Sequence, residues 1–195
     1  MCIRDRKKAF EPLKVEIRGS EHLPKDQKII FIYNHLRNHP YFTVDNTFQI
    51  TLDSHFISSK ILYKYYKNSG TRVVRFSLPE EDEHRRYYNK FNFIRVFSKD
   101  FTPSGFTKKQ IRATNEEFYK KAAKELENKI NLVFSPEGSS YYTDESPGIF
   151  RKGIFKLAAS FKEQPLFVPI VLVNFDKLPS TNISGKFVLL REKKN

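Results

Sequence analysis

The chain has 195 residues, of which 39% are hydrophobic and 19 are phenylalanine, so it is too apolar for a disordered basic tail. It carries 35 Lys and Arg against 22 Asp and Glu, a formal net charge of +13, which is typical of proteins that bind nucleic acid, an anionic membrane surface or small anions. A single cysteine, Cys2, excludes an intramolecular disulfide framework and fits a reducing compartment.

Hydrophobic periodicity and turn residues divide the chain into alternating strands and helices. In chain order the sequence predicts a strand at 13–17, a buried strand at 28–33, a helix from 48 to about 66, a strand at 71–76, a charged loop or short helix at 79–89, an apolar segment at 91–97, an amphipathic helix at 114–128, a strand at 130–134, a short helix at 153–161, a buried strand at 166–173 and a last strand at 186–190. This alternation predicts an α/β fold with a mixed, mostly parallel central sheet flanked by helices.

No segment of the sequence is apolar enough to predict a membrane-spanning helix. The longest apolar run, 166–173, has eight residues, whereas a spanning helix needs about 20. The N-terminus is charged and lacks an apolar stretch, so no signal peptide is predicted. We expect residues 13–190 to form a single domain, preceded by an N-terminal segment, 1–12, whose opening resembles a non-native start.

The loop after the strand at 28–33 contains two histidines four residues apart, His35 and His39, followed by Asp45. A histidine held by a carboxylate is the usual general base for a hydroxyl, because the carboxylate fixes the tautomer and stabilises the imidazolium. A zinc pair is disfavoured, since Leu36 stands where HExxH has its glutamate, and a serine hydrolase would need a G-x-S-x-G elbow that the chain lacks. Histidines that only satisfy local backbone groups are the remaining alternative. The loop therefore favours a His–Asp pair, and no metal is expected.

A second loop, 135–153, follows the strand at 130–134 and combines small, acidic and basic residues. Its candidate ligand-binding residues are Glu137, Gly138, Ser139, Ser140, Arg151 and Lys152. Glycine allows close backbone approach to a ligand, and a basic pair before a helix favours phosphate. The alternative is a Pro-Gly turn followed by a solvated helix start. Because Glu137 and Gly138 lie in a loop, we expect their replacement to cost little stability.

Taken together, these segments resemble the glycerolipid acyltransferases, the family of lysophosphatidate and glycerol-3-phosphate acyltransferases. Four segments occur in family order, namely a lead-in at 15–24, the His/Asp loop, the Phe-Ser-Pro-Glu-Gly-Ser-Ser segment at 134–140 and the strand residues 168–171. The family's first motif is Asn-His, four residues and Asp, and its third is Phe-Pro-Glu-Gly. The resemblance covers roughly residues 13–175 and implies a glycerol-phosphate acyltransferase-like fold.

The chain departs from the first family motif in its spacing. Five residues separate His39 from Asp45, and Pro40 stands where the aspartate paired with His35 would fall. The resemblance therefore implies His39 and Asp45 as the catalytic pair, with His35 as the alternative base.

The second motif is also irregular. Ser98 stands where the family has an arginine that holds the acceptor phosphate, so Arg95 or Lys99 would have to replace it.

The resemblance implies an O-acyltransferase of phospholipid biosynthesis, similar to the 1-acylglycerol-3-phosphate O-acyltransferases. It would move an acyl group from acyl-CoA or acyl-carrier protein, as co-substrate and without a cofactor, to a lysophospholipid or glycerol phosphate. Residues Glu137 to Ser140 would position the acceptor, and Arg95, Lys99, Arg151 and Lys152 would neutralise phosphate. The protein would be cytoplasmic and bound peripherally to an anionic membrane surface.

Two other classes stay open at this point. The irregular first and second motifs fit a non-catalytic lipid-binding relative. A nucleic-acid-binding module would interleave basic and aromatic side chains on a sheet face, but the one such cluster, 63–67, falls in a helical pattern, so no nucleic-acid partner is expected.

Overall fold

The structure is a computed structural model that describes residues 6, 8, 10–11, 15–25, 28–44, 48–49, 51–97, 104–177 and 185–189. Over these residues seven strands form one sheet in the order β1-β9-β8-β2-β7-β5-β6. Their bounds are β1 Val15–Arg18, β2 Ile29–Tyr33, β5 Thr71–Arg75, β6 Ile94–Val96, β7 Leu132–Phe134, β8 Leu166–Val173 and β9 Gly185–Leu189. Strands β8 and β9 pair antiparallel, and the other neighbours pair parallel. The predicted α/β fold with a mostly parallel sheet is confirmed, whereas the single domain over 13–190 stays a prediction.

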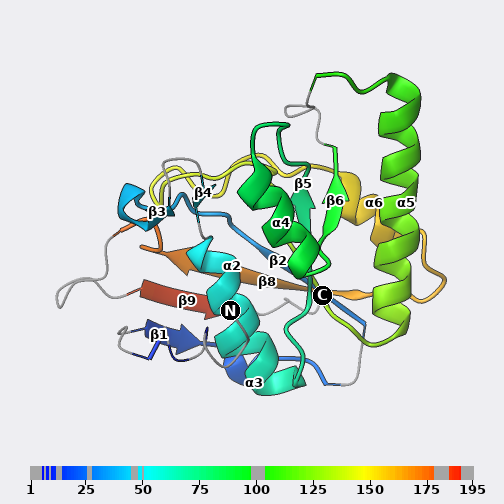
Figure 1. The fold of residues 1–195 in the computed structure, drawn as a ribbon. Helices are drawn as coiled ribbons and strands as arrows, with labels where there is room; N and C mark the ends of the chain where they lie inside the picture. The colour runs from blue at the N-terminus through cyan, green and yellow to red at the C-terminus, as the bar shows by residue number, and fades with distance from the viewer. Residues whose placement is uncertain are drawn as a thin grey trace.

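Helices lie on both sides of the sheet (Figure 1). The helical segments are η1 Ser20–His22, η2 Pro40–Phe42, α2 Leu52–Phe56, the π-helix η3 Ile57–Leu62, α3 Tyr63–Tyr66, α4 Asp82–Lys90, α5 Lys108–Glu127 and α6 Gly153–Ala159. A separate antiparallel pair consists of β3 Thr43–Val44 and β4 Phe48–Gln49. Figure 1 shows α2 and α3 in front of the sheet and α5 and α6 to its right.

Alternate residues of the central strands supply two separate cores, because successive side chains of a strand point to opposite faces. Phe31 and Val133 pack with Phe56, Ile57 and other apolar residues of α2 and η3 on one face. On the other face, Ile30 and Leu132 pack with apolar side chains of α5 and α6. The strands are therefore apolar on both faces, as expected for a parallel sheet covered by helices.

Two helix boundaries differ from the sequence prediction. The predicted helix at 48–66 begins only at Leu52, after the short strand β4, because Thr51 is extended and acts as the N-cap. Helix α5 begins at Lys108 rather than at residue 114, because Thr107 and Gln110 form a capping box. The charged segment at 79–89 is a helix, α4, and the apolar segment at 91–97 contains the edge strand β6.

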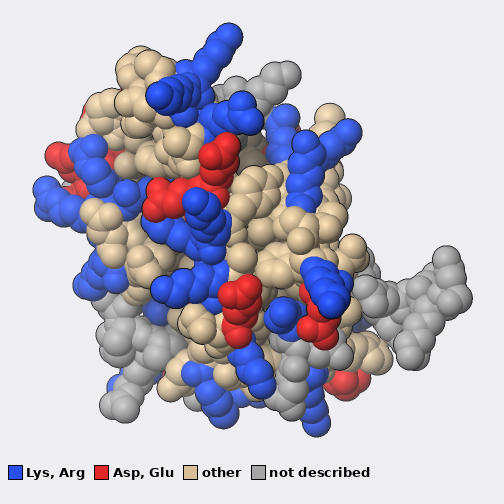
Figure 2. Space-filling view, turned by 90° about the vertical axis from the view of Figure 1, so that its right-hand side faces the viewer, with Lys and Arg blue, Asp and Glu red and all other residues tan. Residues whose placement is uncertain are grey.

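Much of the basic charge is spread over the face that carries α5 and α6. Figure 2 shows this face, where Lys and Arg are numerous and acidic residues lie among them. On α5, Arg112 pairs with Glu116 and Lys121 with Glu117, each four residues apart. Such exposed pairs contribute little to stability and are typical of a solvated helix surface.

Gly70, which connects α3 to β5, provides a test of the packing between η3 and the sheet. It has φ +66°, and a Cβ there would lie 2.7 Å from Leu62 Cδ1 and 2.9 Å from Val133 Cγ2. We expect Gly70→Ala to lower the free energy of unfolding by about 2–4 kcal/mol through backbone strain and overpacking. Gly105, at φ +91° with nothing within 4 Å, is the matched control, and Gly105→Ala should cost only the strain, about 1–2 kcal/mol. Equal losses in urea unfolding would contradict this packing.

Candidate active site

The two loops singled out from the sequence lie side by side at one edge of the sheet. Strands β2 and β7 are parallel neighbours, with Ile32 opposite Phe134, so their carboxyl ends meet. Beyond them, the Tyr141 N–H donates to the carbonyl of His35 at 2.9 Å, and the Arg37 N–H donates to the carbonyl of Tyr141 at 2.8 Å. The loops thus continue the sheet for a short distance and bring residues about 100 positions apart in sequence into contact.

His35 contacts a carboxylate other than Asp45, the one that motif spacing predicts as a catalytic partner. Its Nδ1 lies 2.5 Å from Oδ2 of Asp53, in the first turn of α2. The Asp53 side chain is 1% exposed and that of His35 is 26% exposed. Since a carboxylate accepts, Nδ1 donates to Asp53 and Nε2 is the nitrogen that can take a proton from a substrate. The pair has the arrangement of a histidine general base and its orienting acid.

Backbone groups hold Asp53 in place as well. Its Oδ1 accepts from the Ser54 N–H at 2.5 Å, and its Oδ2 accepts from the Leu36 N–H at 3.2 Å. Asp53 therefore fixes both the ring of His35 and the backbone of the residue after it, and the carboxylate has donors on both oxygens, as a buried charge requires.

The pKa of each residue is shifted by the charge of the other. Burial would lower the pKa of His35, but the charge of Asp53 and the hydrogen bond to it outweigh burial and raise that pKa above its ordinary value. Burial would raise the pKa of Asp53, yet His35 and the Ser54 N–H hold it below its usual range. Both shifts favour the imidazolium–carboxylate form, which is the state that a general base reaches after it takes a proton.

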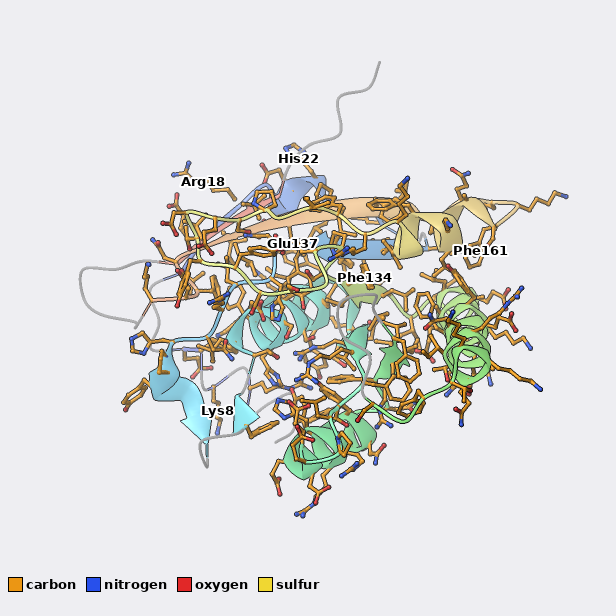
Figure 3. The ribbon with its side chains drawn as sticks, turned by 90° about the horizontal axis from the view of Figure 1, so that it is seen from above. Lys8, Arg18, His22, Phe134, Glu137 and Phe161 are labelled. Atoms are coloured by element: carbon orange, nitrogen blue, oxygen red, sulfur yellow. The ribbon has the colours of Figure 1, made fainter. Side chains whose placement is uncertain are left out.

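Glu137 links the two loops from inside the molecule. Its side chain is completely buried, at 0% exposure, and Figure 3 shows it in the interior, away from the labelled surface residues. Oε2 accepts from the His35 N–H at 2.5 Å and from the Ser135 hydroxyl at 3.4 Å. Oε1 accepts from the Gly148 N–H at 2.6 Å and from the Ser146 hydroxyl at 3.3 Å. All these partners belong to the protein, so the structure gives Glu137 a positioning role; a direct substrate contact stays a prediction.

The expectation that replacing Glu137 costs little stability is based on its position in a loop, and it stays a prediction. The loop turns this glutamate inward, where it accepts from two backbone N–H groups, so the burial of Glu137 favours a larger cost. Gly138, by contrast, is exposed at φ +72°, with the side chain of Arg151 3.5 Å from the position of a Cβ. Ser139, Arg151 and Lys152 are exposed on the same loop, and the Ser140 carbonyl accepts from Arg37 Nε at 3.2 Å.

The other predicted site residues are placed elsewhere or lie outside the described residues. His39 accepts from the Tyr41 N–H at 3.2 Å in the same loop. Asp45 and Lys99 lie outside the described residues, so the pairing of His39 with Asp45 stays a prediction. Arg95 is in β6, three strands from β2 in the sheet order, where it donates to Asn89 and lines a separate pocket of about 270 Å³. The structure does not bring Arg95 to His35.

A buried cation, Arg72, lies near the His35–Asp53 pair. It is 3% exposed, and its Nη1 is 3.4 Å from both Thr51 Oγ1 and the Tyr87 hydroxyl. Its Nε and Nη2 have no hydrogen-bond partner within the described residues. The positive charge lowers the pKa of His35 and of Asp53, so it partly offsets the effect of the carboxylate on the imidazole. Arg72 therefore adjusts the basicity of the pair.

Another histidine, His55, is buried against Tyr87 and is held neutral. Burial, followed by the charges of Arg72 and Arg6, lowers its pKa to about 2. The Tyr87 hydroxyl contacts its Nε2. His55 is thus fixed as a neutral hydrogen-bonding group and is no candidate for the base.

The sequence contains a signal for Asp53 that lies outside the motif spacing. Between Asp45 and Glu80 it is the only acidic residue, and it lies in a mainly apolar helical segment. A lone carboxylate there needs a buried partner. Asn34, the polar residue between β2 and His35, is a similar case. It is 8% exposed, and its side chain exchanges hydrogen bonds of 2.6 and 3.0 Å with the backbone of Leu172 in β8.

Comparison with solved structures finds a similar backbone in the 1-acyl-sn-glycerophosphate (LPA) acyltransferase PlsC from Thermotoga maritima. The TM-score is 0.56 and the sequence identity 16%, over 95% of this chain and 67% of that one. No model of a protein family and no curated protein matches the sequence. In the described part of the chain, no helix is long and apolar enough to span a bilayer. The similarity shows that this chain has the α/β fold of that acyltransferase.

The ion pair can be tested by titrating His35 in the Asp53→Asn variant. Asparagine keeps an oxygen acceptor but removes the charge, so burial and Arg72 should then dominate and the pKa of His35 should fall. NMR titration of the imidazole measures this, with the exposed His22, which contacts Glu21, as the internal control. The pKa of His35 is higher in the folded state than in the unfolded state, where it is near 6.5, and this difference stabilises the folded protein at pH values below 6.5. The contribution is lost as the pH rises through the folded-state pKa. Asp53→Asn should therefore cost more unfolding free energy near pH 6 than near pH 9. A His35 pKa that does not change would contradict the pair.

The buried role of Glu137 is tested by Glu137→Gln. Each of its oxygens accepts from a backbone N–H, so the amide NH₂ of glutamine must face a donor in either orientation. We expect a loss of about 2–3 kcal/mol in unfolding free energy. Glu163→Gln is the control, because Glu163 is 86% exposed and forms only a surface ion pair with Lys28, at 3.7 Å. This variant should change the free energy of unfolding by less than about 0.5 kcal/mol. If both variants unfold at the same urea concentration, Glu137 does not hold the loops together.

Proposed function

We propose that this protein is an O-acyltransferase that moves an acyl group from an acyl-CoA or acyl-carrier-protein thioester to a hydroxyl of a lysophospholipid or glycerol phosphate. The observation that carries the proposal is the His35–Asp53 pair, 2.5 Å apart at the carboxyl ends of the parallel strands. The fold, which this chain shares with the LPA acyltransferase PlsC of Thermotoga maritima, supports the same chemistry.

In the proposed reaction His35 acts as the general base. The acceptor hydroxyl has a pKa far above 7, so its proton must leave as its oxygen attacks the thioester carbonyl. Nε2 of His35 takes that proton, and Asp53 stabilises the imidazolium that forms. The tetrahedral intermediate then expels the thiolate, which takes the proton from Nε2 of His35 and leaves as the thiol, so that His35 returns to its neutral form. No covalent enzyme intermediate and no cofactor take part.

We assign the base to His35, in preference to His39, because His35 has a buried carboxylate partner. The side chain of His35 is 26% exposed, while that of Asp53 is almost inaccessible. Glu137 fixes the backbone of His35 and thereby acts as a positioning residue. Gly138, Ser139 and Ser140 would approach the acceptor, and Arg151 and Lys152 would neutralise its phosphate.

The substrates also imply an anionic membrane surface as a partner, since lysophospholipids are drawn from a bilayer. The nucleic-acid alternative gains no support, because the cluster of Tyr63, Lys64 and Tyr65 lies on the helix α3, whereas stacking platforms use a sheet face.

The proposal predicts thiol release from acyl-CoA that depends on an acceptor such as lysophosphatidate or glycerol 3-phosphate. Removal of a general base typically costs 10²–10⁴-fold in rate, and His35→Ala should fall in that range. His39→Ala, in the same loop, is the matched control and should lose less than about tenfold, as a residue without the base role. An active His35→Ala beside an inactive His39→Ala would move the base to His39. If no acceptor supports turnover by the folded protein, the non-catalytic lipid-binding alternative replaces the enzyme.

A further inference from the structure

The loop that carries Glu137 also presents an exposed apolar pair. Ile149 is 83% exposed and Phe150 is 45% exposed, and the two residues that follow, Arg151 and Lys152, are exposed as well. We refer to residues 149–152 as the apolar-basic tip. A side chain this exposed adds little to the packing of the fold. Where the backbone that carries an exposed apolar pair is fixed, the pair indicates an interaction site.

The backbone on both sides of Ile149 and Phe150 is fixed. The Gly148 N–H donates to Glu137 at 2.6 Å, and the Arg151 N–H donates to the Pro136 carbonyl at 2.6 Å. The ring of Tyr141 covers Gly148 so closely that a Cβ there would lie 2.4 Å from its Cζ. These contacts hold Ile149 outward. Its exposure is therefore a feature of the folded loop.

The surroundings of the apolar-basic tip are basic. Residues 146–162 contain Arg151, Lys152, Lys156 and Lys162 and no Asp or Glu. Asp144 and Glu145 precede this segment and Glu163 follows it, and Glu145 accepts from the Tyr142 N–H at 3.3 Å. Tyr142 is itself 43% exposed, with the Arg37 guanidinium 4.9 Å from its ring. Exposed apolar and aromatic side chains among cations are complementary to an anionic bilayer, which offers both hydrocarbon and negative headgroups.

We propose that the apolar-basic tip is the docking point of this protein on an anionic lipid bilayer, with Ile149 and Phe150 entering the interface and the basic residues contacting the headgroups. One carboxylate, Glu137, accepts from both Gly148 at the start of the tip and His35, so docking places the candidate active site beside the bilayer. Docking itself does not depend on the proposed function. Only its purpose, the delivery of a lipid acceptor, rests on that function. A protruding side chain suits a fluid bilayer better than an acidic carrier protein, which would have to provide a shaped pocket for it.

The chain contains no tryptophan, so one introduced tryptophan reports on its own site. We would measure the fluorescence of Ile149→Trp with vesicles of phosphatidylcholine alone and of phosphatidylcholine with phosphatidylglycerol. Emission should shift to the blue, and be quenched by brominated acyl chains, with the anionic vesicles. Tyr63→Trp, at a position 40% exposed on α3, is the matched control and should show neither change.

Affinity is tested with a double variant, Ile149→Ser with Phe150→Ser, in vesicle sedimentation without substrates. Binding to anionic vesicles should weaken at least about tenfold, because both apolar side chains leave the interface. Arg151→Gln with Lys152→Gln should weaken it about fivefold per residue, and less at high salt. Circular dichroism checks that each variant is folded.

The outcomes separate docking from catalysis. Unchanged vesicle binding by the double serine variant overturns the docking proposal, whatever the enzyme activity. Binding to acidic carrier protein but not to vesicles also overturns it and makes the apolar-basic tip a protein interface. Vesicle binding that depends on the tip, without acyl transfer, supports the docking proposal. In that case the acyl-transfer assay alone contradicts the proposed function.

Discussion

The candidate site depends on a buried carboxylate that must be neutralised. Asp53 is almost inaccessible, and a buried charge is tolerated only with a partner charge and hydrogen bonds. His35 supplies the charge, and the N–H groups of Leu36 and Ser54 supply donors. The contact therefore ties the loop after β2 to the first turn of α2. It also orients the imidazole so that Nε2 is left for a substrate.

The same logic extends to the neighbouring loop. Glu137 is a second buried carboxylate, and it is satisfied by backbone donors from both sides, His35 and Gly148. Two acids thus hold one histidine, Asp53 through its ring and Glu137 through its backbone. Arg72, buried with two nitrogen atoms that lack partners in the described part of the chain, compensates part of this negative charge. The site is fixed by electrostatic requirements of buried groups, while the residues proposed to meet substrates, Ser139 and Lys152 among them, remain exposed.

Hydrophobic patterning predicted the fold class, the two loops at the carboxyl ends and every strand of the described sheet except β6, because apolar side chains on both faces of β2 and β8 leave long apolar runs in the sequence. It did not predict the partner of His35. Asp53 lies 18 residues away, at the start of α2, and only the return of the chain to that point brings it to the imidazole. A search for motif spacing found Asp45 instead, since spacing counts residues and not the path of the chain. Motif spacing does not predict the burial of Glu137 for a related reason. Its backbone donors, His35 and Gly148, come from two loops that are far apart in sequence.

A double-mutant cycle on the rate of acyl transfer tests the central claim most directly, that His35 and Asp53 act as one unit. The rates of His35→Gln, Asp53→Asn and the variant with both changes are compared with that of the unchanged protein at saturating acceptor. We expect each single change to slow transfer strongly and the double change to be little slower than His35→Gln alone, because the carboxylate has no task without the imidazole. Losses that multiply would show that the two residues act independently and would contradict the account.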